Sequence, residues 1–491
     1  MVTARRACPA AAGPLEEYAA GFDGLFASLA QRRGFREYLT GLLLPRERNK
    51  TLTALAGAEP VVGAGNPAVQ RLQFFLSESG WDAEQVNTRR LELLAADAAT
   101  APHQGGVLVV DDSGDRKDGH ATAHVARQYL GSVGKTDNGI VAVCTLWADE
   151  RVYYPLHVAP YTPAGRLPGG GDDPGFATKP EIAVDLVDRA VAAGVGFAAV
   201  VGDCFYGPSE TITLTGALER AGLPYVLALK PRMKTWARAE DAHSPIEAAQ
   251  DLGWHSRRRP GGWHRVTRRF RDGHTETWWA GDARLAGWGP DQPQRLVVAS
   301  TDPGRLPERS TWYVVTNRPH PDRADDEMTT LPAADLAEIV RCYGLRNWVE
   351  QGYKQVKHEL GWADFQVRSD IAIRRHYTLV CCAFSFCWQA WITDPPPTVN
   401  AATATGDRPT GRRERGHQHV HDGQPATDTP LAGHAATHPQ LADPGHAAAT
   451  LLAGPGRTRP HHPNCSSYSP PSLPATRSPP TSRPNKPPLV R

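Results

Sequence analysis

Apolar residues recur at helical spacing in the first fifth of the chain. Leu15, Tyr18, Phe22 and Phe26 repeat every three or four residues, which predicts amphipathic helices over residues 14–100, broken by the Gly/Pro stretch 57–67. Basic side chains in the first of these helices fit either a solvated helix face or a helical DNA-binding domain, and the sequence favours neither. These residues are Arg32, Arg33, Arg36, Arg46, Arg48 and Lys50.

Short apolar runs replace the helical pattern over residues 101–235. The runs 107–110, 197–201 and 225–229 predict buried strands, and the pattern predicts further strands within 129–143 and 152–158. Between them Thr178-Lys-Pro-Glu181 forms a capping-box pattern that predicts the start of a helix ending near Gly194. Strands that alternate with a helix indicate an α/β domain with a mixed sheet.

Strand patterns without helices continue to residue 330. Segments 263–271 and 274–279 flank Asp272-Gly273, a dipeptide typical of type I′ hairpin turns, and 296–299 and 312–316 predict two more strands. Residues 331–394 return to helical periodicity. The last segment, 395–491, is dominated by Pro, Gly, Ala, Thr, His and Arg, and it has too few apolar residues to offset its chain entropy, so we expect disorder there.

Composition narrows the class of protein only a little. Fifty-four Lys and Arg balance 52 Asp and Glu to a net charge of +2, which neither demands nor excludes a nucleic-acid partner. The eight cysteines contain no Cys-x-x-Cys pair and lie largely in apolar runs, so we expect reduced thiols. No apolar run follows the basic N-terminus and none reaches membrane-spanning length, which predicts a soluble, cytoplasmic protein.

Four polar residues near the C-terminal end of the helical region have a spacing that brings them together. Tyr343, Arg346, Glu350 and Lys357 are three, four and seven residues apart, so on one α-helix they line a single stripe. A carboxylate flanked by two cations suits metal-assisted phosphoryl chemistry. The alternative is an ordinary solvated helix face, in which Glu350 pairs with a neighbouring cation.

Two aspartates upstream change this balance. Asp112 and Asp203 each follow a short buried strand, and the carboxyl ends of strands are where sites gather in open α/β sheets. Three carboxylates together can hold a pair of hard divalent cations.

With these residues the chain resembles the DDE transposases of prokaryotic insertion sequences, in the branch that has a Y-x2-R-x3-E-x6-K signature. Tyr343, Arg346, Glu350 and Lys357 match that spacing, and the segments 107–114 and 202–207 resemble the strands that carry the first and second aspartates. The resemblance covers residues 15–393.

This resemblance implies an RNase H-like mixed-sheet core with a β-rich insertion, preceded by an all-helical N-terminal domain. The expected organisation is a flexible N-terminus (1–13), a helical DNA-binding domain (14–100), the first part of the core (101–235), the insertion (236–330), the C-terminal helices of the core (331–394) and a disordered tail (395–491).

The family's roles carry over residue by residue. Asp112, Asp203 and Glu350 are the implied catalytic ligands of two Mg²⁺ or Mn²⁺ ions. Asp112 is preferred because the first acid of the family usually precedes Ser or Thr directly, and Asp111 is the alternate. Implied DNA contacts come from the signature helix and from the insertion, where Trp312 resembles a tryptophan that stacks on a flipped base. They are Tyr343, Arg346, Lys357, Trp312, Arg268 and Arg269.

The implied reaction is hydrolysis of a phosphodiester at an element end, followed by attack of the freed 3′-hydroxyl on DNA. The implied partners are double-stranded DNA, namely the terminal inverted repeats and the target, with a dimer in the synaptic complex. Two alternatives stay open: an inactive copy that only binds DNA ends, and a related nuclease that does not transpose. The alternative for Trp312 is a structural role as a core aromatic residue. The alternative for Arg268 and Arg269 is to keep an exposed edge strand soluble.

Overall fold

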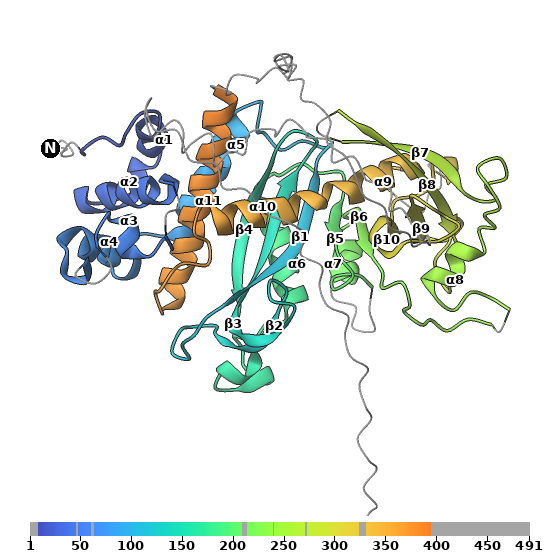
Figure 1. Ribbon diagram of the computed structural model, residues 1–491, viewed down its shortest axis with the longest axis horizontal. Coiled ribbons are helices and arrows are strands. Elements are labelled where there is room, and N and C mark those ends of the chain that lie inside the picture. Colours follow the sequence, from blue (N-terminus) through green and yellow to red (C-terminus); the bar gives the residue numbers. More distant parts are fainter. Residues whose placement is uncertain are drawn as a thin grey trace, which may run out of the picture. The chain divides into compact units, whose positions relative to one another are not determined.

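The computed structural model describes residues 8–45, 48–59, 63–208, 214–238, 240–270, 273–323 and 330–393, without the side chain of Ala64. Its elements follow the order shown in Figure 1. The strands of the first half are β1 (Val107–Arg116), β2 (Ala126–Leu130), β3 (Lys135–Ala148), β4 (Tyr153–Tyr161), β5 (Val200–Gly202) and β6 (Tyr225–Ala228). The strands of the second half are β7 (His264–Arg269), β8 (Thr275–Ala283), β9 (Arg295–Ser300) and β10 (Thr311–Thr316).

These strands form one mixed sheet. β3 pairs antiparallel with β1, β2 and β4, whereas β1, β5 and β6 run parallel to one another. The insertion strands continue the same sheet, because β10 pairs antiparallel with β6 and leads on to β9, β8 and β7. The partly parallel, mostly antiparallel open sheet is consistent with an RNase H-like core, and the predicted β-rich segment extends that core.

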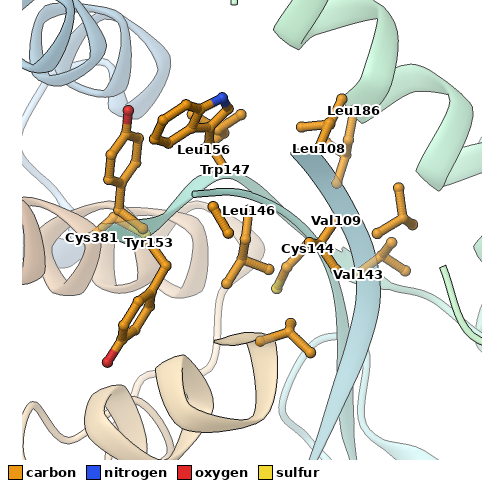
Figure 2. Packing of buried hydrophobic residues seen from close by; sticks show 14 of the residues in the cluster. Leu108, Val109, Val143, Cys144, Leu146, Trp147, Tyr153, Leu156, Leu186 and Cys381 are labelled. Carbon is orange, nitrogen blue, oxygen red and sulfur yellow. The ribbon is translucent and has the colours of Figure 1, made fainter. Parts of the chain in front are cut away.

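Helices cover both faces of the first part of the sheet. α6 (Lys179–Ala192) packs on β3 and β4, and Figure 2 shows Leu108 of β1 next to Leu186 of this helix. α10 (Asn347–His358) and α11 (Asp370–Thr393) pack on β4 through the ring of Tyr153, which contacts Trp348, Phe384 and Trp388. Successive side chains of a strand point to opposite faces, so each residue of β1 faces one helical layer or the other. Two shorter helices, α7 (Leu214–Arg220) and α8 (Pro245–Gln250), follow β5 and β6.

The N-terminal helices share the core of the sheet. They are α1 (Leu15–Ala20), α2 (Leu29–Leu43), α3 (Leu52–Leu55), α4 (Pro67–Ser77) and α5 (Ala83–Ala96). α2, α4 and α5 pack on α11, and one hydrophobic cluster runs from Leu15 through β1 to Trp388. The predicted helices are therefore present, while the predicted domain boundaries stay a prediction.

Several basic residues of this helical region are turned inward. Arg36 is 4% exposed in its side chain and binds Glu16 and Asp23, each at 2.7 Å. Lys50 is buried and donates to the backbone carbonyls of Leu42 and Leu44, and Arg32 is buried as well. Buried cations are neither a solvated face nor, in this conformation, a DNA contact, so both interpretations of these three residues are wrong. Arg46 lies outside the described residues.

Two predicted elements differ from those observed. β1 runs to Arg116 rather than ending at residue 110, because β3 pairs with it along its whole length. The predicted single signature helix is two helices, α9 (Leu336–Leu345) and α10, which meet at Arg346. The capping box of α6 is confirmed, with the Thr178 hydroxyl accepting from the Glu181 amide and the Glu181 carboxylate accepting from the Thr178 amide. Asp272 of the predicted hairpin turn and the tail 395–491 lie outside the described residues.

Among the helices that the structure describes, none is long and apolar enough to cross a membrane.

Candidate active site

Asp111 and Asp203 lie level with each other on neighbouring parallel strands. Val110 of β1 is in register with Gly202 of β5, and each aspartate is the next residue. Adjacent strands are about 4.8 Å apart and share one pleat, so the two carboxylates project from the same face of the sheet. Two residues that are distant in the sequence thus meet because the two strands pair in this register.

Arg346 lies between the two carboxylates. Its Nη2 is 3.7 Å from Oδ2 of Asp111 and 3.8 Å from Oδ2 of Asp203. Burial lowers the pKa of Arg346, but the charges of Asp111, Tyr343, Asp203 and Glu350 outweigh it and raise the pKa overall. Among the residues that the structure describes, the buried Nε of Arg346 has no hydrogen-bond partner. The Arg346 guanidinium therefore faces both Asp111 and Asp203, at distances that allow an ion pair but are too long for a hydrogen bond.

The surroundings of Asp111 disfavour its ionised form. Burial raises its pKa from 3.8 to about 7, Arg346 opposes the shift, and the charge of Asp203 adds to it. The amide of Asp112 donates to its Oδ1 at 2.9 Å. A buried carboxylate next to a second carboxylate is short of positive charge, and that is the setting in which an added cation is stabilised.

Asp112 faces the other way. Its Oδ2 accepts from Nζ of Lys179 at 3.0 Å, at the N-terminus of α6 on the opposite face of the sheet. The alternation of side chains along β1 is the reason: once the strand continues through both aspartates, neighbours must point to opposite layers. The structure therefore brings the alternate Asp111, and not Asp112, to the side of Asp203 and Arg346.

Glu350 lies in the first turn of α10, one helical turn beyond Arg346, and its side chain is exposed. Its charge acts on Arg346. Within the described part of the chain, no three His, Cys, Asp or Glu side chains are close enough together to hold a metal ion. The two aspartates are thus assembled, and Glu350 is on the adjoining helix without completing a three-ligand cluster.

Lys357 reaches a different carboxylate. Its Nζ is 2.7 Å from Oδ1 of Asp115 and donates to the carbonyl of Gly114 at 3.2 Å. Asp115 lies further along β1 on the same face as Asp111, because alternate residues of a strand share a face, and it is 5% exposed. Lys357 thereby joins the end of α10 to the far end of β1.

The remaining predicted DNA contacts form an aromatic cluster. Trp312 of β10 is partly buried, with its ring centroid 4.2 Å from Trp278 and 5.0 Å from Tyr343. The guanidinium of Arg268 lies 4.9 Å from the Trp312 ring centroid and donates to the carbonyl of Gly344. Arg269, its neighbour on β7, is exposed. Trp312, Tyr343 and Arg268 therefore tie the insertion to the end of α9.

Sequence reasoning missed two residues near the acids. The sequence indicates a role for Lys179 only within a capping box. A cation is unfavourable at a helix N-terminus, so its presence there could have indicated a carboxylate partner nearby. Tyr206 is buried, its hydroxyl has no hydrogen-bond partner among the described residues, and burial together with the charges of Asp112, Asp111 and Asp203 raises its pKa well above 10.0. The following Gly207 lies so close to Ala228 that a Cβ would meet its carbonyl oxygen at 2.1 Å. Tyr206 belongs to the segment 202–207 that resembles the second-aspartate strand, but the pattern gave it no separate role.

Comparison with known proteins shows the family of this chain. The family model described as "DDE superfamily endonuclease" matches residues 23–283, which include Asp111, Asp112 and Asp203 but not Glu350. The chain is also 32% identical over 367 residues to the "Probable transposase for insertion sequence element IS701" of Microchaete diplosiphon, a match that covers 75% of this chain and 85% of that protein.

The chain therefore belongs to the DDE superfamily of endonucleases, and within that class to the insertion-sequence transposases. Membership implies, in general, a DNA substrate and dependence on a divalent metal ion. The donor set around Asp111 and Asp203 fits such an ion, because it consists of carboxylate oxygens and carries too little positive charge of its own.

Proposed function

We propose that this transposase cleaves DNA at the ends of its element and transfers the freed strand, using Asp111, Asp203 and Glu350 as the catalytic carboxylates. The observation that carries the proposal is the level pairing of Asp111 with Asp203 beside Arg346. Asp112 is not included, because Lys179 holds it on the opposite face.

Two Mg²⁺ or Mn²⁺ ions at these carboxylates would supply the positive charge that in-line displacement at phosphorus requires. The chain's own residues then set the geometry. The Arg346 guanidinium lies beside both aspartates and offsets the repulsion between their negative charges. Glu350, exposed one helical turn beyond Arg346, is the proposed third carboxylate.

Double-stranded DNA is the proposed partner, first as terminal inverted repeats and then as target, and two chains act together when two ends are joined. Of the predicted DNA contacts, Arg269 is exposed and Arg346 faces the acids, which supports a proposed role for these two at the DNA backbone. Trp312, Tyr343 and Arg268 support the cluster beneath them, and Lys357 holds α10 to β1.

The test is a Mg²⁺-dependent cleavage assay on a plasmid that carries the gene with its native flanking DNA. Asp111→Asn, Asp203→Asn and Glu350→Gln should each lower the cleavage rate by at least ~100-fold, in line with loss of a group that supports the charged transition state. Asp112→Asn is the matched control and should stay within about tenfold of wild type. Inactivity of Asp112→Asn together with activity of Asp111→Asn would reverse the assignment.

Wild-type protein that binds the flanks and does not cut them would instead make this chain an end-binding copy. Discrete cuts without joined products would make it a nuclease that does not transpose. Products in which the freed 3′ end is joined to new DNA support the transposase reaction as proposed.

A further inference from the structure

The segment after β6 exposes three cations and a tryptophan at alternate positions. From Arg232 to Arg238 the residues alternate between exposed and partly buried. The exposed members are Arg232, Lys234, Trp236 and Arg238. Exposure at every second position is the pattern of a chain whose alternate side chains share a side. The segment thus exposes three cations with an aromatic ring among them, and Nζ of Lys234 lies 3.7 Å from Oε1 of Glu247.

Trp236 is out of place for a folded protein. Its side chain is 98% exposed, while the other tryptophans of the core, such as Trp147, Trp263 and Trp388, are almost fully buried. Leaving a large apolar ring in water forgoes the free energy of burial, unless a ligand covers it. The side chains on either side of Trp236 in the exposed row are cations, which the face of an indole ring attracts.

The segment is held in place beneath its exposed side. Met233 packs against the main hydrophobic cluster, and the amide of Thr235 donates to the carbonyl of His243 at 3.0 Å. The amide of Ile246 donates to the carbonyl of Pro231 at 3.2 Å. The row of Arg232, Lys234, Trp236 and Arg238 therefore sits on an anchored strip.

This strip starts next to the candidate active site. Gly202, which precedes Asp203, is in register with Leu227 of β6, so the C-terminal ends of these two parallel strands lie side by side. Lys230, two residues beyond β6, is near enough for its charge to lower the pKa of Cys204, which burial raises overall. Five residues lie between Lys230 and Trp236, so their Cα atoms are at most ~20 Å apart.

We propose that Arg232, Lys234, Trp236 and Arg238 bind a single-stranded stretch of DNA beside the cleavage point, with a base stacked on Trp236. The cations meet the phosphates, and the indole offers the sequence-tolerant platform that an unpaired base requires. Cleavage at a duplex end exposes unpaired nucleotides, so the strip has a ligand at the place where the reaction produces it. The inference rests on the proposed function for the location of that strand.

The experiment measures binding of a fluorescein-labelled 20-nucleotide oligo-dT by fluorescence anisotropy, without metal. Trp236→Ala should weaken binding by about 5- to 100-fold, and Trp236→Phe should restore most of the affinity, because stacking needs a ring rather than an indole. The matched control is Tyr129→Ala, which removes a 61% exposed aromatic on β2, at the opposite edge of the core sheet. That variant should bind as wild type does.

Salt dependence separates the two kinds of contact. Arg232→Ala should reduce the slope of log affinity against log salt by about 0.7, the value for one phosphate of a single strand, and Trp236→Ala should leave the slope unchanged. Because all these side chains are exposed, unchanged melting temperatures would show that the variants fold.

Wild-type affinity of Trp236→Ala for oligo-dT would overturn the inference, as would an equal loss in Tyr129→Ala. Failure of the proposed function is distinguishable, because it is read from cleavage. A chain that loses oligo-dT binding in Trp236→Ala but never cuts DNA keeps the strip and loses the catalytic assignment. Normal cleavage together with unaltered oligo-dT binding in Trp236→Ala keeps the catalytic assignment and contradicts the role of the strip.

Discussion

At the scale of single residues, the neighbouring acids Asp111 and Asp112 have opposite surroundings. Asp111 faces Asp203 and a shared arginine, and Asp112 forms an ion pair with Lys179. The rule that the first acid directly precedes Ser or Thr selects Asp112, whereas the register of β1 favours Asp111. Since that register is set by pairing with β3 and β5, no local sequence rule could decide between them.

Asp111 should make the stability of the protein depend on pH. Burial raises its pKa from 3.8 to about 7, so the folded state binds a proton that the unfolded state releases. This contribution to the free energy of unfolding is fully present below pH ~4 and is lost as the pH rises through about 7. Relative to Asp111→Asn, the wild type should lose on the order of 3 kcal/mol between those limits in metal-free urea titrations.

Asp112→Asn serves as the control for that titration, because it removes the adjacent carboxylate on the other face. Its curve should still fall between those limits, because Asp111 is present and buried. Parallel curves for wild type and Asp111→Asn would contradict the assignment of a buried, proton-binding Asp111.

At the scale of elements, the signature motif is divided between two helices. Tyr343 lies in α9, Arg346 lies at the junction, and Glu350 and Lys357 belong to α10. The helical spacing was recognisable in the sequence because it is local. The partners of each residue were not, since Trp312, Asp111 and Asp115 come from three distant places in the chain.

Lys357 should contribute to stability. Its ammonium neutralises Asp115, which is 5% exposed and has one carboxylate oxygen without a partner in the described part of the chain. Lys357→Met leaves that charge uncompensated and should lower the free energy of unfolding by roughly 3–5 kcal/mol. Adding Asp115→Asn should recover a large part of the loss. A purely DNA-contacting Lys357 would instead leave urea unfolding unchanged and lower only DNA affinity.

The two neighbouring arginines of β7 should behave differently. Arg268 lies over the rings of Phe270 and Trp312 and donates to Gly344, so Arg268→Ala should cost roughly 1–2 kcal/mol of stability. Arg269 is exposed, so Arg269→Ala should keep the melting temperature. It should reduce the salt slope of duplex binding by about 0.9. Thermal melts and filter binding check both, and identical profiles for the two variants would refute the division.

At the scale of the whole molecule, the N-terminal helices and the sheet share polar contacts as well as apolar ones. Arg90 of α5 is fully buried and donates to the carbonyls of Pro155 and Leu156 in β4 and to the hydroxyl of Ser385 in α11. Its Nε and Nη2 also bind Asn87. One side chain thus connects three elements that are far apart in the sequence.

Arg90→Ala should therefore weaken the whole fold. The substitution removes the Arg90 donor from the carbonyls of Pro155 and Leu156 and from the Ser385 hydroxyl, and we expect a decrease of about 3 kcal/mol in the free energy of unfolding. Far-UV circular dichroism and tryptophan fluorescence should give coincident transitions for wild type, because the helices and the sheet share one core. An early, separate helical transition in the wild type would show that the N-terminal helices unfold on their own.

By itself, the sequence determined the local elements and the class of the protein. The capping box at Thr178, the strands at 225–229 and 312–316 and the signature spacing depend on neighbours within a few residues, so they are readable from the chain. Only the tertiary structure decided which aspartate meets Asp203, that Lys357 binds Asp115, and that the insertion continues the core sheet. Those outcomes follow from strand register and packing between distant segments, where a shift of one residue exchanges the two faces of a strand.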